Sequence, residues 1–207
     1  MQCSRTALNA AAWAARPQRK TTSRRYSLAI VRSVNAGELV SRLRSLVRRE
    51  SKQSRWLVVA DVNVFVRAFL GHPDGANNRI VEAALTGVLV LVMSEDIRAE
   101  TIEVLSREET GGYDPEVAAE IMEPVCKAAR MVFPGPDDPQ YRKVVRDPDD
   151  RIIIRTAAGT YVDEDLASMP KRAIVSGDTH SFPRGRSWYG FRYFTAAEFW
   201  HMLQDED

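Results

Sequence analysis

The sequence is poor in cysteine and lacks long apolar runs. Its 207 residues include only two cysteines, Cys3 and Cys126, and neither has a His or Cys nearby at the spacing of metal ligands. This excludes a disulfide scaffold and a structural zinc site, and it favours a reducing compartment. A membrane-spanning helix needs about 18 or more apolar residues, whereas the apolar run Val88–Met93 is followed at once by Ser-Glu-Asp. The sequence therefore excludes a transmembrane protein and favours a cytoplasmic one.

Acidic residues are scarce in the first quarter of the chain. Residues 1–55 contain 13 Lys or Arg and only two acids, a net charge of +11, whereas residues 56–207 contain 16 Lys or Arg against 26 Asp or Glu, a net charge of −10. We interpret residues 1–54 as a basic extension and residues 55–207 as the globular domain. The Arg-rich stretch 10–25 has no acids and no apolar periodicity, so we expect it to be disordered.

The start of the extension also has the composition of an organellar transit peptide, since it is rich in Arg, contains Ser and Thr, and lacks acids. Residues 1 to about 26 would then be removed, and the protein would act in an organelle. The alternatives are a basic tail that binds nucleic acid, a tail without a function, and a translation start assigned too far upstream.

An amphipathic helix is predicted near the end of the extension. Asn35 and Glu38 have the spacing of a capping box, and apolar residues follow at helical spacing, which predicts a helix over about 36–49. Its polar face carries four arginines: Arg42, Arg44, Arg48 and Arg49. This face is predicted either to contact RNA or an acidic partner, or simply to be solvated.

The globular part alternates β-favouring runs with helical patterns. The runs cover 56–60, 88–93 and 172–175, and the predicted helices cover about 78–85, 95–106, 114–130, 149–158 and 196–203, with a polar connection over 137–146. Strands separated by helices predict a three-layer α/β/α domain with a mostly parallel central sheet. Ligands of such sheets bind beyond the carboxyl ends of the strands, so the residues at those ends matter most for function.

Acidic side chains follow these strands. Asp61 ends the first strand and Asp178 ends the third. On the helix after the second strand, Glu100 lies about 60° from the inward-facing Ile97, whereas Glu103 lies about 120° from it. Glu100 is therefore the acid that points into the domain.

A fourth acid comes from the sequence Asp-Pro-Asp-Asp at 147–150. Asp150 shares the apolar face of the helix that begins there, and Asp149 lies about 100° away from that face. Asp150 is therefore the acid aligned with the buried side, while Asp147 and Asp149 stay open as rival ligands.

Four converging carboxylates repel one another strongly unless cations neutralise them. Oxygen ligands with no nearby Cys or His favour Mg²⁺ or Mn²⁺ over zinc. Asn63 is placed to orient Asp61, and the Ser176 hydroxyl is placed to orient Asp178. Carboxylate-bound divalent ions predict hydrolysis of a phosphodiester by metal-activated water.

The acids lie in four segments that resemble, in order, the four motifs of PIN domains. The segments are Val58–Val66, Leu91–Glu100, Val145–Asp150 and Ile174–Asp178. They look closest to the branch of VapC-like ribonucleases, the toxin components of bacterial toxin-antitoxin pairs. The resemblance extends from about Trp56 to Leu203 and departs from the family pattern at 159–170, which looks like an insertion.

The resemblance implies a Mg²⁺- or Mn²⁺-dependent endoribonuclease that cleaves single-stranded RNA. The family's carboxylates correspond here to Asp61, Glu100, Asp150 and Asp178, with Asn63 and Ser176 in support. An antitoxin protein, structured RNA and a second copy in a homodimer are the further partners it suggests. No membrane partner is expected.

Three alternatives stay open at this point. A basic-aromatic stretch that includes Arg184, Arg186 and Trp188 is predicted either to bind and stack single-stranded RNA or to serve ordinary packing. The domain is alternatively a catalytically weak module that binds RNA or a protein partner. A phosphatase or phosphotransferase with Asp61 as nucleophile is disfavoured, because Asn63 replaces the second Asp that such enzymes use.

Overall fold

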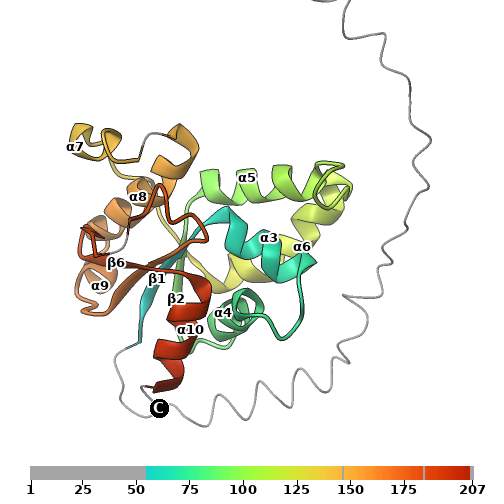
Figure 1. Cartoon of the computed structure of the whole chain (residues 1–207), viewed down its shortest axis with the longest axis horizontal. Helices are drawn as coiled ribbons and strands as arrows, with labels where there is room; N and C mark the ends of the chain where they lie inside the picture. Colours follow the sequence, from blue (N-terminus) through green and yellow to red (C-terminus); the bar gives the residue numbers. More distant parts are fainter. Residues whose placement is uncertain (1–54, 146, 184, 206–207) are drawn as a thin grey trace, which may run out of the picture. The chain divides into compact units, whose positions relative to one another are not determined.

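Figure 1 shows the computed structural model, which describes residues 55–145, 147–183 and 185–205. The predictions for residues 1–54, namely disorder near 10–25, a helix over about 36–49 and a transit peptide, lie outside the described residues, as does Arg184.

A six-stranded sheet forms the centre of the described part of the chain. Its strands are β1 (Leu57–Ala60), β2 (Val90–Met93), β3 (Arg130–Met131), β4 (Arg172–Val175), β5 (Ser187–Trp188) and β6 (Phe191–Phe194). They lie in the order β3-β2-β1-β4-β6-β5, and all neighbours are parallel except the β5–β6 hairpin. The predicted mostly parallel sheet is therefore confirmed.

Helices cover both faces of this sheet (Figure 1). They are α3 (Val62–Leu70), α4 (Ala76–Leu85), α5 (Glu95–Ser106), α6 (Pro115–Ala128), α7 (Pro139–Arg142), α8 (Pro148–Gly159), α9 (Glu164–Ala167) and α10 (Ala196–Asp205), with the 3-10 helix η1 (Thr160–Val162) after α8. Helices α3 to α6 and α10 pack together on one face, and α8 packs against β1 and β2 on the other. Within the described residues, no helix has both the length and the apolarity that crossing a bilayer requires.

The first strand lies at the centre of the core. All four of its side chains are buried, and β2 and β4 pair with it on either side. A parallel strand covered on both faces requires such a continuous apolar sequence, because neither face meets water. The parallel pairing also brings the carboxyl ends of β1, β2 and β4 to one edge of the sheet.

The helix that carries Glu100 has the predicted bounds, because its first turn is capped as the sequence indicates. The Ser94 hydroxyl accepts a hydrogen bond from the amide of Ile97, as expected of an N-cap residue. The last helix is also capped as predicted. The Thr195 hydroxyl accepts from the Glu198 amide, and the Glu198 carboxylate accepts from the Thr195 amide, which completes a capping box.

Several predicted boundaries need correction. The second strand begins at Val90, because the amides of Val88 and Leu89 both donate to Ala83 in the turn after α4. The helix predicted over 114–130 ends at Ala128, and the chain then forms β3 at the sheet edge. The polar connection over 137–146 contains the one-turn helix α7, and the insertion over 159–170 contains η1 and α9.

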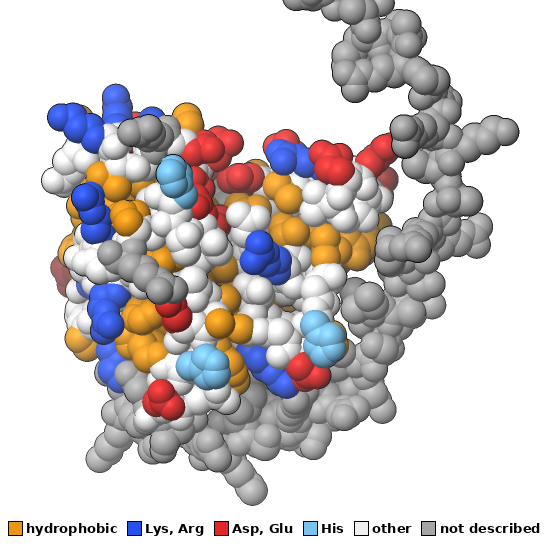
Figure 2. Space-filling view, in the orientation of Figure 1, with side chains coloured by type: hydrophobic (Ala, Val, Ile, Leu, Met, Phe, Trp, Pro, Cys, Tyr) orange, Lys and Arg blue, Asp and Glu red, His pale blue; other side chains and the backbone are white. Residues whose placement is uncertain are grey.

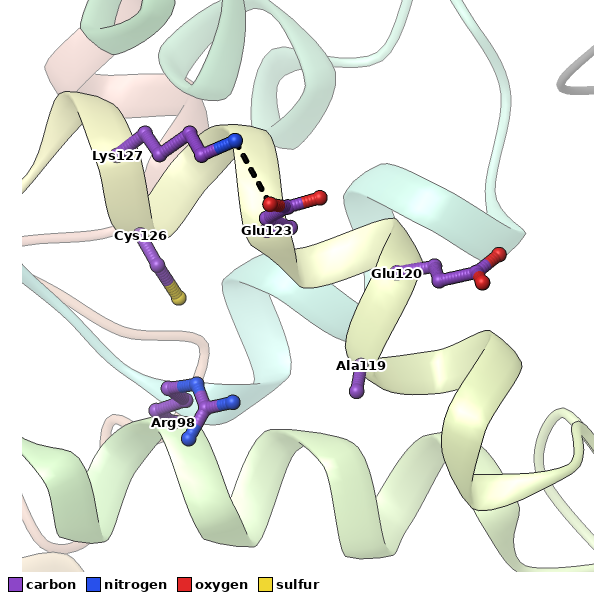
Figure 3. A pocket seen from close by; sticks show the side chains of 6 residues that line it. All are labelled: Arg98, Ala119, Glu120, Glu123, Cys126 and Lys127. Atoms are coloured by element: carbon purple, nitrogen blue, oxygen red, sulfur yellow. Dashed lines mark ion pairs between the residues drawn. The ribbon is translucent and has the colours of Figure 1, made fainter.

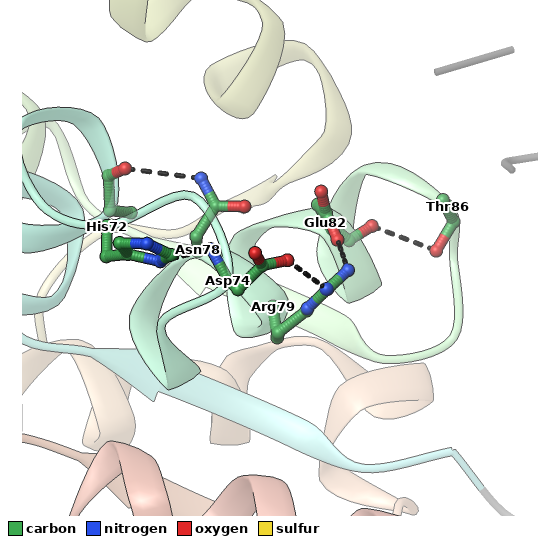
Figure 4. A network of polar contacts seen from close by, with 7 residues as sticks. His72, Asp74, Asn78, Arg79, Glu82 and Thr86 are labelled. Atoms are coloured by element: carbon green, nitrogen blue, oxygen red, sulfur yellow. Dashed lines mark hydrogen bonds and ion pairs between the residues drawn. The ribbon is translucent and has the colours of Figure 1, made fainter. Parts of the chain in front are cut away.

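The connection between α3 and α4 is fixed by polar contacts (Figure 4). Arg79 lies between Asp74 and Glu82, with nitrogen-to-oxygen distances of 2.6 Å and 3.0 Å. The Asn78 amide also donates to the carbonyl of Ala68 at 3.2 Å. These contacts hold the end of α3 against α4, which matters below because α3 begins at the candidate site.

The prediction that Trp188 stacks on RNA is wrong in this structure. Trp188 is 1% exposed and packs edge-on against Phe182 at 5.7 Å between ring centroids, while Phe182 stacks on Tyr193. A ring enclosed in this way has no free face for a base, so the alternative of ordinary packing holds. Arg186 is exposed, and its contact with RNA stays a prediction.

Replacement of Trp188 by Ala is expected to lower the free energy of unfolding by about 3–5 kcal/mol, because it leaves a cavity in the core. Replacement of the exposed Arg186 by Ala should change it by less than about 0.5 kcal/mol. Urea unfolding followed by circular dichroism measures both values. A Trp188→Ala variant that is as stable as the wild type but binds RNA weakly would restore the stacking role.

Candidate active site

Asp61 joins the ends of β1 and β4. It follows β1 as the N-cap residue of α3, is 4% exposed, and its amide donates to the carbonyl of Val175 at 2.9 Å. Its Oδ2 accepts from the Ser176 hydroxyl at 2.6 Å and from the Asn63 side-chain amide at 3.5 Å. The carboxylate is therefore held in one orientation by hydrogen bonds from two segments.

The position of Ser176 corrects one detail of the prediction. Its hydroxyl was expected to orient Asp178, but it donates to Asp61 and accepts from the backbone amide of Asp178 at 2.9 Å. One hydroxyl thus connects the first and fourth acidic segments. Asn63 does contact Asp61, as the sequence predicts.

Asp178 lies in the turn after β4 and is surrounded by donors. Its carboxylate accepts from the backbone amides of His180 at 2.7 Å and Ser181 at 3.3 Å. Burial alone would raise the pKa of Asp178, but hydrogen bonds from Ser181 and from the His180 amide outweigh it and bring the pKa below its ordinary value. Asp178 is therefore ionised at neutral pH.

Asp150 lies in the first turn of α8 and contacts the turn after β4 that carries Asp178. The Ser181 hydroxyl donates to its Oδ2 at 2.6 Å, so Ser181 connects the third and fourth acidic segments. Burial raises the pKa of Asp150, the Ser181 bond partly offsets this, and the charges of Asp61 and Asp178 raise it further. Asp150 and Asp178 thus share Ser181 as a hydrogen-bond partner.

Glu100 reaches the same region from α5. Burial and then the negative charges of Asp149, Asp61 and Asp150 raise its pKa to about 7. Glu103, three residues further, is exposed and pairs with Arg107 at 2.8 Å. The choice of Glu100 as the inward acid of this helix therefore agrees with the structure.

A buried hydrogen bond connects the two helices that carry Glu100 and Asp150. The Thr156 hydroxyl on α8 donates to the Ser94 hydroxyl at the start of α5 at 2.9 Å, and both side chains are fully buried. This contact ties the start of α5 to α8 and so helps to position the helices that carry Glu100 and Asp150.

The two rival acids before Asp150 have different surroundings. Asp147 is the N-cap of α8, where its Oδ1 accepts from the Asp149 amide at 3.0 Å, and it is exposed. Asp149 is also exposed, yet its charge is the largest electrostatic influence on Glu100. Asp147 thus has a structural use as the N-cap of α8, and Asp149 stays a rival ligand.

The acids make this face of the domain negative. Figure 2 shows acidic side chains gathered in a hollow between the region of α7 and α8 and the region of α5. Among the ion pairs of the described residues, none joins Asp61, Glu100, Asp150 or Asp178 to Lys or Arg. Within the described residues, no ion pair therefore neutralises these four carboxylates.

This donor set fits a hard divalent cation. The groups are carboxylate and hydroxyl oxygens, which Mg²⁺ and Mn²⁺ prefer. Within the described ranges, however, no three His, Cys, Asp or Glu side chains lie close enough together to hold a metal ion as they stand.

A second hollow lies elsewhere, between α5 and α6 (Figure 3). It is lined by Arg98, Ala119, Glu120, Glu123, Cys126 and Lys127, and contains none of the four acids. Burial raises the pKa of Cys126, so its thiol stays protonated at neutral pH and is a poor nucleophile. This hollow carries no catalytic group.

Comparison with known proteins agrees with this geometry. The model of the PIN domain family matches residues 57–180, more than half of the chain, so the chain belongs to the PIN domain family. PIN domains are generally metal-dependent nucleases that use divalent ions and act on nucleic acids. In separate comparisons with curated proteins and with solved structures, no protein matches the chain.

A residue beside the acids that the sequence analysis missed is Ser181. It is 7% exposed and contacts both Asp150 and Asp178. Asp178 itself was a local signal, because an Asp side chain in a turn often accepts hydrogen bonds from backbone amides two or three residues later, which forms an Asx turn. Its contact with Asp150, however, joins residues 31 apart and has no local signature.

The raised pKa of Glu100 predicts how stability depends on pH. The folded protein holds this proton up to about pH 7, whereas an ordinary glutamate loses it near 4.5, so stability falls as pH rises across that range. With EDTA at pH 8, a Glu100→Gln variant should be more stable than the wild type by about 1 kcal/mol, after allowance for solvent screening. Urea unfolding at pH 5 and pH 8 measures the difference.

The matched control is Glu103→Gln on the same helix, which should follow the wild type at both pH values. If Glu100→Gln loses as much stability between pH 5 and pH 8 as the wild type does, the carboxylates do not converge as described.

Replacement of Ser181 by Ala removes a donor from Asp150 and should raise the pKa of Asp150 further. Because residues that orient ligands typically contribute 10- to 100-fold to metal affinity, we expect a weakening of Mn²⁺ binding of about that size. Calorimetric titration with Mn²⁺ measures it, with the exposed Ser168→Ala as control. Equal Mn²⁺ affinities in the two variants would remove Ser181 from the site.

Proposed function

We propose that this PIN domain is a Mg²⁺- or Mn²⁺-dependent endoribonuclease that cleaves single-stranded RNA. The observation that supports this most directly is the electrostatic coupling of Glu100 and Asp150 to the other acids in the absence of any ion pair to Lys or Arg among the described residues. A divalent cation bound among these acids would offset the repulsion between them at neutral pH. A bound divalent cation activates water and stabilises the charge that develops on a phosphodiester during hydrolysis.

The four acids divide this work according to their surroundings. Asp61 is buried and fixed by the Ser176 hydroxyl, and Asp178 has a lowered pKa, so these two carboxylates are the permanent anchors of a cation. Glu100 and Asp150 have raised pKa values and lie on the two helices that flank the anchors. They would hold a second cation or orient the attacking water.

The raised pKa of Glu100 makes cation binding sensitive to pH. Burial and neighbouring acids raise this pKa to about 7. A carboxylate must lose its proton to bind a cation, so binding at Glu100 would release that proton. The expected products carry a 3′-hydroxyl and a 5′-phosphate.

The preference for RNA and a role as the toxin of a toxin-antitoxin pair rest on the likeness of the four acidic segments to the VapC-like branch. A toxin requires an antitoxin protein that closes the site until it is released. We also propose that two copies of this chain form a homodimer. Of these finer assignments, the preference for RNA is tested by the cleavage and binding assays below.

One observation favours a second function, the binding of RNA or a protein partner without cleavage. In the part of the chain that the structure describes, no ready-made group of three metal-ligating side chains is present. If rearrangement of the carboxylates around a cation required more free energy than binding supplies, the domain would retain nucleic acid without hydrolysing it.

An Asp61→Asn variant separates the two functions. Asn keeps the size of the side chain and the acceptor for Ser176 but removes the charge, so we expect cleavage of single-stranded RNA with Mn²⁺ to fall at least about 100-fold, as when one charge-stabilising group is removed from other enzymes. Gel analysis of a labelled RNA measures cleavage. RNA binding should stay within about threefold, because Asp61 is not a cation that contacts phosphate.

The control is Glu120→Gln on α6, which removes one exposed negative charge away from the acids and should cleave like the wild type. If wild type and Asp61→Asn degrade RNA equally, the activity is not that of this site. If the wild type binds RNA but leaves it intact with Mg²⁺ and with Mn²⁺, the binding function replaces the proposed one.

A further inference from the structure

An arginine lies beside the acids without a structural use of its own. Arg67 is on the last turn of α3, the helix that Asp61 begins, and its side chain is exposed. It takes part in none of the ion pairs between described residues. An exposed arginine free of such pairs keeps its full charge available to a ligand.

The guanidinium of Arg67 is held over the turn that carries the fourth acid. A Cβ atom placed on Gly177 would lie 3.4 Å from its Nη1, 3.7 Å from its Cζ and 3.9 Å from its Nη2. The guanidinium therefore lies close to Gly177, between Ser176 and Asp178 in the chain. No ion pair with a described residue directs it elsewhere.

Other arginines near the acids have structural partners. Arg98 pairs with Glu95, Arg107 pairs with Glu103, and Arg155 donates to the carbonyl of Gly135. Each of these contacts occupies a donor of the guanidinium and ties it to a neighbouring element. Arg67 differs because no ion pair with another described residue occupies its donors.

A nuclease with this charge distribution needs such a cation. Residues 56–207 have a net charge of −10, and the acids face the strand to be cut, so the domain repels a polyanion as it approaches. A planar guanidinium can donate two parallel hydrogen bonds to one phosphate. A lysine at the same place would supply the charge alone.

We propose that Arg67 binds a backbone phosphate of the RNA strand next to the one cleaved, and so positions the strand over the acids. This inference rests on the proposed function for its substrate class. It assigns to α3 both an acid, Asp61, and the cation that offsets the repulsion between the acids and RNA.

The test uses the full chain with Asp61→Asn, so that RNA binding is measured without cleavage. Adding Arg67→Gln should weaken the binding of a labelled single-stranded oligonucleotide about tenfold at 0.1 M salt, as expected for the loss of a charged phosphate contact. It should also reduce the slope of log affinity against log salt concentration by about 0.7, the value for one phosphate of a single strand. Arg67→Lys should restore the slope and only part of the affinity.

The matched control is Lys127→Gln, which removes one positive charge from α6, where Lys127 pairs with Glu123 (Figure 3). It should change the affinity by less than about twofold, since an exposed pair contributes little. In the protein with Asp61 intact, Arg67→Gln should raise KM and leave kcat within about twofold.

The proposal would be overturned if adding Arg67→Gln left the RNA affinity and the salt slope of the Asp61→Asn parent unchanged. It would also be overturned if Arg67→Gln and Lys127→Gln lowered the RNA affinity equally. Absence of RNA binding by the Asp61→Asn parent itself would also overturn it. A wild type that binds RNA through Arg67 without cleaving it would contradict the proposed endoribonuclease and leave the phosphate contact in place.

Discussion

Repulsion between carboxylates at one edge of the sheet is the constraint on which the rest of the site depends. The parallel pairing of β1 with β2 and β4 brings the ends of three strands together, and acidic side chains follow each of them directly or on the next helix. The result is visible in Glu100, whose pKa is raised by burial and by three neighbouring acids. Such an arrangement lowers stability at neutral pH, a cost that the proposed binding of cations would offset.

Hydroxyl groups keep the acids in place without neutralising them. Ser176 connects Asp61 to the Asp178 turn, Ser181 connects Asp150 to the same turn, and Ser94 with Thr156 joins the two helices. A basic residue in any of these places would also have positioned a carboxylate, but it would have competed with a cation for the same charge. Neutral donors orient the ligands and leave the charge for the metal.

The sequence predicted the features that depend on local pattern. Helical geometry separated Glu100 from Glu103, the apolar run before Asp61 predicted a buried parallel strand, and Ser94 predicted the start of α5. It did not predict the short strands at the sheet edges, because two residues carry no readable period. Hydrogen bonds between distant segments could not be predicted either. Ser176 and Asp61 are 115 residues apart, and only the folded chain shows which acid the Ser176 hydroxyl contacts.

The most direct test of the account is a crystal structure of the protein with Mn²⁺, in which anomalous scattering locates the ions. If the four acids form a cation site, one or two ions lie in the acidic hollow, contacted by oxygens of Asp61, Glu100, Asp150 and Asp178. Ions bound only elsewhere, or four carboxylates that stay apart at Mn²⁺ concentrations that support RNA cleavage, would contradict it.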